Sequence, residues 1–340
     1  MRISVAMATY NGAKYIEQQL LSLASQTVLP YELVVTDDGS TDKTLAIVET
    51  FGKGAPFPVR IHRNADRLNF ADNFLRAASL CQGDWIAFCD QDDVWMETKL
   101  EWVTRSIEQD VVMVVHRVQV VDEVLRCIPG KSASCRVRRG RKAQCLPPMG
   151  FFPGMSITFK ATLVELLMQR PRFFDINNER CEAAHDKWVS SVADAVGVVK
   201  YLDETLVSYR QHGANTCGAS TGSYIDGWVE TIAARGSDYR SAAMLAEQYS
   251  ECFHTLATSP AGERWKESLE ATALRYRATH NYLLARAALY SADRFPSRLR
   301  AFASMSIRWS YRFNPIRPPI FAFMKDVFTV LFRPVYEKTA

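Results

Sequence analysis

The sequence predicts an α/β fold, in which helices cover both faces of a mostly parallel sheet and a helical region follows. Short apolar segments alternate with helical segments through the first half of the chain, a pattern typical of strands joined by crossover helices. Glycine becomes rare beyond about Tyr224, where Ala, Leu, Arg and Glu dominate, and this composition favours helices. We therefore expect two domains, residues 1–222 and residues 223–340.

Four segments near the N-terminus are predicted to be strands, and the first of them lacks the polar alternation of a half-exposed strand, as expected for a strand buried on both faces. They span residues 3–8, 32–36, 59–62 and 85–88. Helical spacing of apolar residues predicts the intervening helices at 15–25, 43–51 and 73–80. Ser40 or Thr41 is expected to cap the second of these helices.

The alternation continues less regularly after the fourth strand. Helices are predicted at 99–110 and 161–169, strands at 111–115, within 150–159 and at 197–202, the end of the core region at 207–212, and a linker at 213–222. About three helices are expected between 224 and 292. Residues 126–142 contain Lys and Arg but no acidic residue. We expect a mobile loop there, which is either simply solvated or grips an anionic substrate or a membrane face.

Polar side chains follow the predicted strands at their carboxyl ends. They are Asn11, Asp37, Asp38, Asp90 and Asp92. Parallel sheets bind their ligands outside this edge, so the position favours a binding site. The segment 90–93 places three carboxylates directly after a buried strand. Oxygen ligands of this kind suit Mg²⁺ or Mn²⁺, although a capped strand end without a ligand would have the same local sequence.

Composition excludes several classes of protein. Hydrophobic residues make up 48% and charged residues 23%, which excludes a disordered chain. The eight cysteines form no CxxC pair, so we expect no zinc ribbon but reduced thiols in a cytoplasmic protein. The N-terminus lacks the features of a signal peptide, and no run of about 18 apolar residues predicts a transmembrane helix.

The C-terminal region contains a segment, residues 294–325, that has no acidic residue and combines Arg with aromatic side chains. This composition is typical of a segment that lies on a membrane surface. Two alternatives remain open, namely helices that pack on the core with outward-pointing Arg side chains, and a nucleic-acid surface. We expect a peripheral membrane contact and no nucleic-acid partner.

A set of motifs resembles, in order along the chain, those of family 2 glycosyltransferases with the GT-A fold. The motifs are Thr9-Tyr10-Asn11-Gly12, Asp37-Asp38-Gly39-Ser40, Asp90-Gln91-Asp92-Asp93, His185-Asp186-Lys187-Trp188 and Tyr209-Arg210-Gln211-His212. The resemblance covers about residues 2–218. The DQDD form of the third motif is similar to the branch that contains bacterial rhamnosyltransferases and O-antigen enzymes.

The resemblance implies an inverting transferase that depends on Mg²⁺ or Mn²⁺. Its donor would be a nucleoside-diphosphate sugar, such as dTDP-rhamnose or a UDP-sugar. Its acceptor would be a glycan or a lipid-linked molecule in bacterial surface polysaccharide synthesis. Such an enzyme would work in the cytoplasm, peripherally on the inner face of the cytoplasmic membrane. The alternatives are a non-catalytic nucleotide-sugar or glycan-binding protein of the same fold, or a membrane-associated scaffold.

The metal and diphosphate sites follow from the same resemblance. Asp92 and His212 are expected to bind the cation that neutralises the departing diphosphate. Asp90 would assist at the metal or hydrogen-bond the ribose, and Arg210 would contact a phosphate oxygen. An ordinary loop histidine without a ligand role is the alternative for His212.

The nucleotide pocket is expected to contain Ala8, Tyr10, Asn11 and Asp38. Tyr10 would stack on the base, and Asp38 would accept a hydrogen bond from the imide N–H of uracil or thymine. Supporting roles are expected for Asp37, Gln91, Asp93 and Trp188. Asp37 is alternatively only a charge at a helix N-terminus, and Trp188 either lines the acceptor site or belongs to the core.

Asp186 is the expected general base, which would remove the proton of the acceptor hydroxyl as its oxygen attacks the anomeric carbon. Members of the family more often have a Glu-Asp pair at this place, whereas His185 precedes Asp186 here. The surroundings of the base therefore differ from the common pattern. Glu179 and Glu182 are competing candidates.

Overall fold

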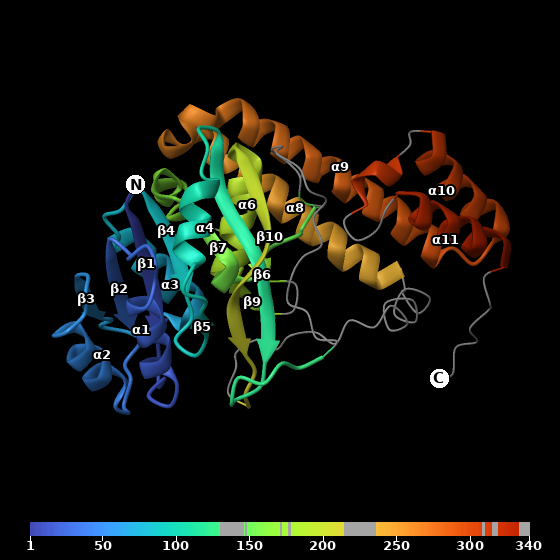
Figure 1. The fold of residues 1–340 in the computed structure, drawn as a ribbon. Coiled ribbons are helices and arrows are strands. Elements are labelled where there is room, and N and C mark those ends of the chain that lie inside the picture. Colours follow the sequence, from blue (N-terminus) through green and yellow to red (C-terminus); the bar gives the residue numbers. More distant parts are fainter. Residues whose placement is uncertain are drawn as a thin grey trace. The chain divides into compact units, whose positions relative to one another are not determined.

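The computed structural model describes residues 1–129, 146, 148–170, 172–175, 178–213, 236–307, 310–314 and 319–332 (Figure 1). Most of the predicted basic loop, the linker at 214–222 and residues 224–235 lie outside this part of the chain. The chain forms two compact units. The first contains Met1–Leu146, Gly150–Arg170 and Ala183–Ser223, and the second contains Pro147–Met149, Pro171–Glu182 and Tyr224–Ala340.

An eight-stranded sheet, mostly parallel as predicted, forms the centre of the first unit in the order β3-β2-β1-β4-β7-β6-β10-β5. Its strands are β1 (Ile3–Thr9), β2 (Glu32–Asp37), β3 (Val59–Arg63), β4 (Trp85–Cys89), β5 (Val94–Trp95), β6 (Val111–Val121), β7 (Ile157–Lys160) and β10 (Val198–Arg210). Only β7 and the short edge strand β5 are antiparallel to their neighbours. The parallel strands therefore end at one edge of the sheet.

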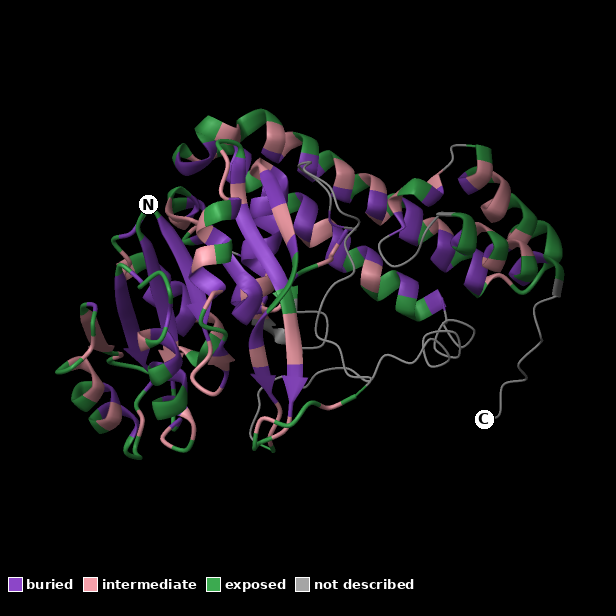
Figure 2. Cartoon of the chain, viewed as in Figure 1, coloured by how far each residue is buried: buried purple, intermediate pink, exposed green. Residues whose placement is uncertain are grey.

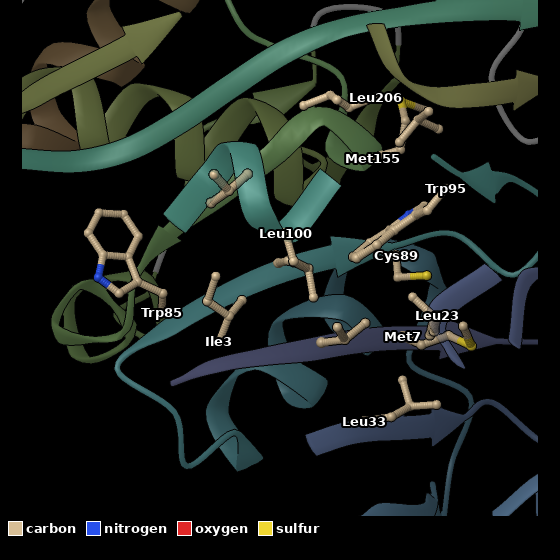
Figure 3. Close-up of a cluster of buried hydrophobic side chains, with 14 of the residues drawn as sticks. Ile3, Met7, Leu23, Leu33, Trp85, Cys89, Trp95, Leu100, Met155 and Leu206 are labelled. Atoms are coloured by element: carbon tan, nitrogen blue, oxygen red, sulfur yellow. The ribbon is translucent and has the colours of Figure 1, made fainter. Parts of the chain in front are cut away.

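Helices cover both faces of this sheet, because successive residues of a buried strand point to opposite sides. They are α1 (Ile16–Ala24), α2 (Thr44–Gly52), α3 (Asn69–Leu80), α4 (Lys99–Ser106), α5 (Val164–Leu167) and α6 (His185–Val196), with the 3₁₀ turns η1 (Gly154–Ser156) and η2 (Ala161–Leu163). On one face, Met7 joins a buried cluster with Leu23 of α1 and Leu100 of α4 (Figure 3). On the other face, Phe88 packs against Phe74 of α3, with ring centroids 5.3 Å apart.

Helix α3 begins at Asn69, four residues before its predicted start, because a distant side chain caps it. The backbone N–H groups of Leu68 and Asn69 each donate to the carboxylate of Asp38 over 2.8 Å. A carboxylate at this position satisfies N–H groups that have no partner within the helix. Since Asp38 precedes the helix by about thirty residues, the sequence around the helix start gave no sign of this cap.

Other boundaries also differ from the predictions. The predicted caps of α2, Ser40 and Thr41, were wrong: the helix begins at Thr44, whose N–H donates to Asp42 over 2.9 Å. Helix α4 ends at Ser106, β6 continues to Val121, residues 161–167 form η2 and α5, and β10 extends the strand predicted at 197–202 as far as Arg210. Strands β6 and β10 lengthen because they pair along their whole course, which no local pattern encodes.

Two long helices, α8 (Gly236–Thr258) and α9 (Lys266–Ser291), pack along each other in the second unit (Figure 2). Its other elements are β8 (Phe174–Asp175), β9 (Asn178–Glu182), η3 (Pro260–Trp265), α10 (Phe295–Ile307), η4 (Ser310–Phe313) and α11 (Pro319–Phe332). Strands β8 and β9 belong here because Phe173 stacks on Tyr249 of α8, with centroids 3.6 Å apart. The N–H of Phe174 also donates to Gln248.

The cysteines that the structure describes agree with the prediction of reduced thiols. The described cysteines, Cys81, Cys89, Cys127 and Cys252, are free thiols. Burial raises the pKa of the Cys89 thiol well above its ordinary value, as expected of a small core residue. In the described parts of the chain, no helix has both the length and the apolar character needed to cross a membrane.

Candidate active site

The carboxyl ends of the parallel strands bring the predicted site residues to one edge of the sheet. Thr9 of β1 lies opposite Asp37 of β2, and Met7 lies opposite Cys89 of β4, so the loops that follow these strands start side by side. Strand β10 reaches the same edge, where the backbone N–H of Arg210 donates to Asp93 Oδ1 over 2.9 Å. This contact sets the end of β10 beside the acidic motif.

His212 and Asp92 meet at this edge, with His212 Nε2 2.8 Å from Asp92 Oδ2. The imidazole ring also stacks on Tyr15, with centroids 4.7 Å apart. Stacking and hydrogen bonding together fix the orientation of the ring. The structure thus brings together the two side chains expected to bind a metal, although they are far apart in the sequence.

Three carboxylates crowd the same place. Burial, followed by the negative charges of Asp92 and Asp186, raises the pKa of Asp90 to about 8, while Lys99 acts in the opposite direction. Asp186 enters this cluster from the first turn of α6. Like charges brought together away from water are costly unless a cation compensates them. The arrangement therefore favours a bound cation.

The donor set fits a hard divalent cation such as Mg²⁺ or Mn²⁺. Asp92 and His212 supply oxygen and nitrogen ligands, and Asp90 lies beside them. Among the residues that the structure describes, no group of three or more His, Cys, Asp or Glu side chains is arranged so that it could hold a metal ion. Mg²⁺ typically retains water and uses substrate phosphate oxygens as further ligands. One or two protein carboxylates are then enough.

Gln91 holds the loop that follows β1. Its Oε1 accepts from the N–H of Tyr10 and its Nε2 donates to the carbonyl oxygen of Tyr10, both over 3.1 Å. Gly12 leaves room for this amide, since a Cβ there would lie 2.2 Å from Gln91 Oε1. The Tyr10 ring remains exposed and lies under the guanidinium of Arg67, 4.0 Å from its centroid. A planar base would have to use the part of the ring that Arg67 leaves uncovered.

The remaining predicted nucleotide residues lie in the same loops. Ala8 is half-buried near the end of β1. Asn11 adopts φ 49°, and its Oδ1 accepts from the N–H of Thr41 over 2.9 Å. Asp38 already accepts three hydrogen bonds, from Leu68, Asn69 and the Asn64 side chain. An imide N–H would therefore have to share a carboxylate that holds the start of α3.

Asp37 is a structural residue of its loop. It accepts hydrogen bonds from the hydroxyl of Thr9, the N–H of Gly39, and both the N–H and the hydroxyl of Ser40. Gly39 has φ 86°, a left-handed conformation that glycine adopts at little cost. Asp37 thus fixes a sharp turn after β2, which agrees with a supporting role more closely than with a charge at a helix end.

The observed contacts of Arg210 differ from the phosphate contact that the sequence led us to expect. Its side chain is 2% exposed. It donates to the carbonyl oxygens of Asp92 and Glu123 and to Gln18 Oε1. The guanidinium also lies over the Tyr15 ring. These contacts make Arg210 a buried clamp behind the acidic motif, so we correct its role to the positioning of Asp92 and Asp93.

Trp188 is a core residue, which decides between the two roles considered for it. The side chain is 0% exposed and its Nε1 donates to the carbonyl oxygen of Leu167 over 3.0 Å. A residue without exposed surface cannot line an acceptor site in this conformation. Its contribution is to hold α6, and with it Asp186, against α5.

Glu182, one of the two competing bases, is already engaged in an ion pair. Glu182 accepts two hydrogen bonds from the buried Arg172 side chain, with an Nη2–Oε2 distance of 2.9 Å, and belongs to the second unit. The side chain of Glu179 lies outside the described part of the structure. Asp186 is therefore the candidate that the structure places with Asp90.

Two residues near this edge were not assigned a role from the sequence. Lys99 is fully buried, donates to the carbonyl oxygen of Met155 over 2.8 Å and lies 3.4 Å from the Trp95 ring centroid. Burial lowers the pKa of Lys99 to about 7, although the negative charges of nearby groups, including Asp93 and Asp90, act in the opposite direction. Arg67 covers Tyr10 from the loop after β3. Lys99 follows the acidic motif closely in sequence, whereas nothing near Arg67 indicated its position.

Comparison with known proteins agrees with this geometry. The sequence model for Glycosyl transferase family 2 matches residues 4–167. The dTDP-rhamnosyl transferase RfbG of Shigella flexneri is 31% identical over 240 residues, which cover 63% of this chain and 74% of RfbG. An uncharacterised glycosyltransferase of Nostoc sp. is 28% identical over 226 residues, covering 63% of this chain and 66% of that protein, just under two thirds.

Solved structures share the fold. S. aureus TarS 1-349, crystallised in complex with UDP-GlcNAc, has a TM-score of 0.52 and 17% sequence identity, with 97% of this chain and 89% of the TarS 1-349 chain covered. Sequence similarity thus defines a transferase, and the solved structures show its GT-A fold, as the motifs predicted. The chain belongs to glycosyltransferase family 2.

Proposed function

We propose that this glycosyltransferase moves a sugar, with rhamnose as the first candidate, from a dTDP or UDP donor to a glycan or lipid-linked acceptor. The reaction inverts the anomeric carbon and serves bacterial surface polysaccharide synthesis. The observation that supports the proposal most directly is that Asp90, Asp92 and Asp186 meet at one strand edge, with His212 beside Asp92. Similarity to a dTDP-rhamnosyl transferase supports the choice of donor.

Asp186 is the general base in this proposal. The acceptor hydroxyl oxygen forms a bond to the anomeric carbon while its proton passes to the Asp186 carboxylate. The bond from that carbon to the diphosphate breaks, and its electron pair remains on the diphosphate oxygen. The N–H of Lys187 donates to Asp186 Oδ1 over 2.8 Å and orients the carboxylate.

Asp92 and His212 would hold Mg²⁺ or Mn²⁺, and Asp90 would assist them or hydrogen-bond the ribose. When bound, the cation supplies positive charge that stabilises the departing diphosphate. Asp93 contributes indirectly, because its Oδ1 accepts from the N–H of Arg210 and keeps β10 in place. The exposed Tyr10 ring stacks on the base, next to Asn11 and Ala8.

The test of the base is transfer of labelled rhamnose from dTDP-rhamnose to a bacterial lipid extract by the full chain. Asp186→Asn should abolish transfer but leave donor binding, measured by calorimetry, within about twofold. Glu182→Gln is the comparison, because it alters the competing carboxylate. Transfer that survives in Asp186→Asn but disappears in folded Glu182→Gln would contradict the assignment.

The metal is tested separately with the same assay. EDTA should abolish transfer and Mn²⁺ or Mg²⁺ should restore it, whereas Asp92→Ala should stay inactive at all metal concentrations. Full activity in EDTA would refute the requirement for a divalent cation. A thermal-shift series with nucleoside diphosphates and Mn²⁺ tests the nucleotide, since selective stabilisation by dTDP over UDP and GDP identifies the donor class.

We place this reaction in the cytoplasm, with the protein held peripherally on the inner face of the cytoplasmic membrane. The support is the basic and aromatic composition of residues 294–325. A lipid-linked acceptor would be presented at that surface.

A further inference from the structure

Helix α11 of the second unit has an apolar outer face, whereas its inner face contains a buried carboxylate. The inner face contains Ala322, Asp326 and Val330, each at most 4% exposed. The outer face contains Ile320, Phe321, Met324, Phe328 and Leu331, which are 50–60% exposed. Their spacing places these five side chains along one stripe of the helix. We call them the α11 stripe.

The charged residues of α11 do not interrupt this stripe. Asp326 is 0% exposed and pairs with Arg286 of α9 over 2.5 Å. Lys325 is half-buried, and its Nζ donates to the hydroxyl of Tyr239 over 3.2 Å. Both charges are therefore directed to partners within the unit. A surface helix normally places polar residues outward, so this helix has the opposite of the usual pattern.

Exposed arginines lie on or beside the elements that contact α11. Helix α10 contacts α11 through Phe302 and Phe323, whose ring centroids are 5.4 Å apart. Arg294, just before α10, and Arg300 within it are exposed, as is Arg312 in η4. Among the described residues from 294 onward, the single acidic side chain is the buried Asp326. Asp293, directly before Arg294, is exposed, so the three exposed arginines outnumber one exposed carboxylate in the described residues from 293 onward.

We propose that the α11 stripe is a membrane anchor that inserts into the interface of a bilayer containing anionic lipid. Apolar side chains would enter the boundary between headgroups and acyl chains, and the arginines would contact lipid phosphates. Charge favours this occupant over a second copy of the chain, because a symmetric dimer would bring two like-charged surfaces together. The inference concerns the second unit alone, so it does not depend on the proposed transfer reaction.

The test is co-sedimentation of the full chain with vesicles of phosphatidylglycerol and phosphatidylcholine, compared with phosphatidylcholine alone. The double variant Phe321→Ser/Phe328→Ser should lower the partition coefficient at least about tenfold on the mixed vesicles. Arg294→Ser/Arg300→Ser should lower it about tenfold on mixed vesicles but little on phosphatidylcholine.

The matched control is Met244→Ser/Leu274→Ser, which removes two apolar side chains that are 62% and 70% exposed in α8 and α9. It should bind vesicles like the unchanged protein. Equal loss in this control, or unchanged binding of the α11 variants, would overturn the proposal. A dimer in light scattering that disappears with Phe321→Ser/Phe328→Ser, without vesicle binding by the unchanged protein, would assign the stripe to a subunit interface instead.

Donor hydrolysis distinguishes a failure of the anchor proposal from a failure of the proposed function. The α11 variants should hydrolyse a soluble nucleotide-sugar at the rate of the unchanged protein. Vesicle binding without any sugar transfer would support the anchor and contradict the proposed reaction. Sugar transfer without vesicle binding would support the reaction and contradict the anchor.

Discussion

The side-chain amide of Gln91 pairs with both backbone polar groups of Tyr10, although the two residues lie on different strand-end loops. Both hydrogen bonds measure 3.1 Å. This pairing links the acidic motif after β4 to the loop after β1. It therefore ties the expected metal ligands to the exposed ring that is expected to hold the base, so that a change at either loop is transmitted to the other.

Gln91→Ala should weaken donor binding, because it removes both hydrogen bonds to Tyr10. At about 0.5–1.5 kcal/mol for each bond, the KM for the donor should rise about tenfold. Gly12→Ala should have the same effect, since its methyl group would displace the Gln91 amide. Gly54→Ala is the matched control, because no atom lies within 4 Å of the added Cβ. An unchanged KM in both site variants would contradict this coupling.

His185 is predicted to position Asp186, the proposed general base. Its ring stacks on Phe74, with centroids 4.0 Å apart, and meets Phe88 edge-on at 4.9 Å. A Cβ at Gly154 would lie 2.6 Å from His185 Nε2. Gly154→Ala should therefore shift the start of α6 and lower kcat about 10- to 100-fold, because displacement of a reacting group by about an ångström has such effects.

The measurement that separates positioning from general damage is the split between kcat and KM. His185→Phe preserves an aromatic ring in the pocket and should retain much more activity than His185→Ala, while the donor KM stays the same in both. If His185→Phe and His185→Ala lose activity equally, or if donor KM rises with the loss, the positioning role is wrong.

Arg210→Lys should destabilise the first unit by about 3 kcal/mol or more, because a lysine ammonium cannot serve the three separate acceptors of a buried guanidinium. Urea unfolding followed by tryptophan fluorescence measures this change. A variant of normal stability with a strongly raised donor KM would instead restore the phosphate contact first expected of Arg210. The exposed Arg63→Lys, at an ion pair with Glu49, should change stability by no more than about 0.5 kcal/mol.

Asp326→Asn should destabilise the second unit by about 3–5 kcal/mol, since it leaves Arg286 charged and buried without its carboxylate. The double variant Arg286→Met/Asp326→Leu should recover most of that loss, because neither position of this buried pair then carries a charge. Glu247→Gln breaks a pair between half-exposed side chains, Arg277 and Glu247, and should cost less than about 1 kcal/mol. Equal destabilisation by the single and double variants would contradict the account.

Much of the first unit was predictable from the sequence because the signals are local. Buried strands have continuous apolar segments, helices have a period of 3.6 residues, and both patterns are properties of neighbouring residues. The carboxyl-end positions of Asp90, Asp92 and Asn11 followed from the strand assignments alone. The motifs around them were sufficient to indicate the family, which the comparisons confirm.

The tertiary structure alone decided which polar residues at this edge hold the fold and which remain available to a ligand. Asp38 caps a helix thirty residues away, Arg210 is enclosed by three acceptors, and Trp188 is completely buried. Their partners come from distant segments, so no local pattern encodes them. The same holds for the α11 stripe: the sequence showed an apolar, basic segment, but only the inward pairing of Asp326 and Lys325 revealed which face is exposed.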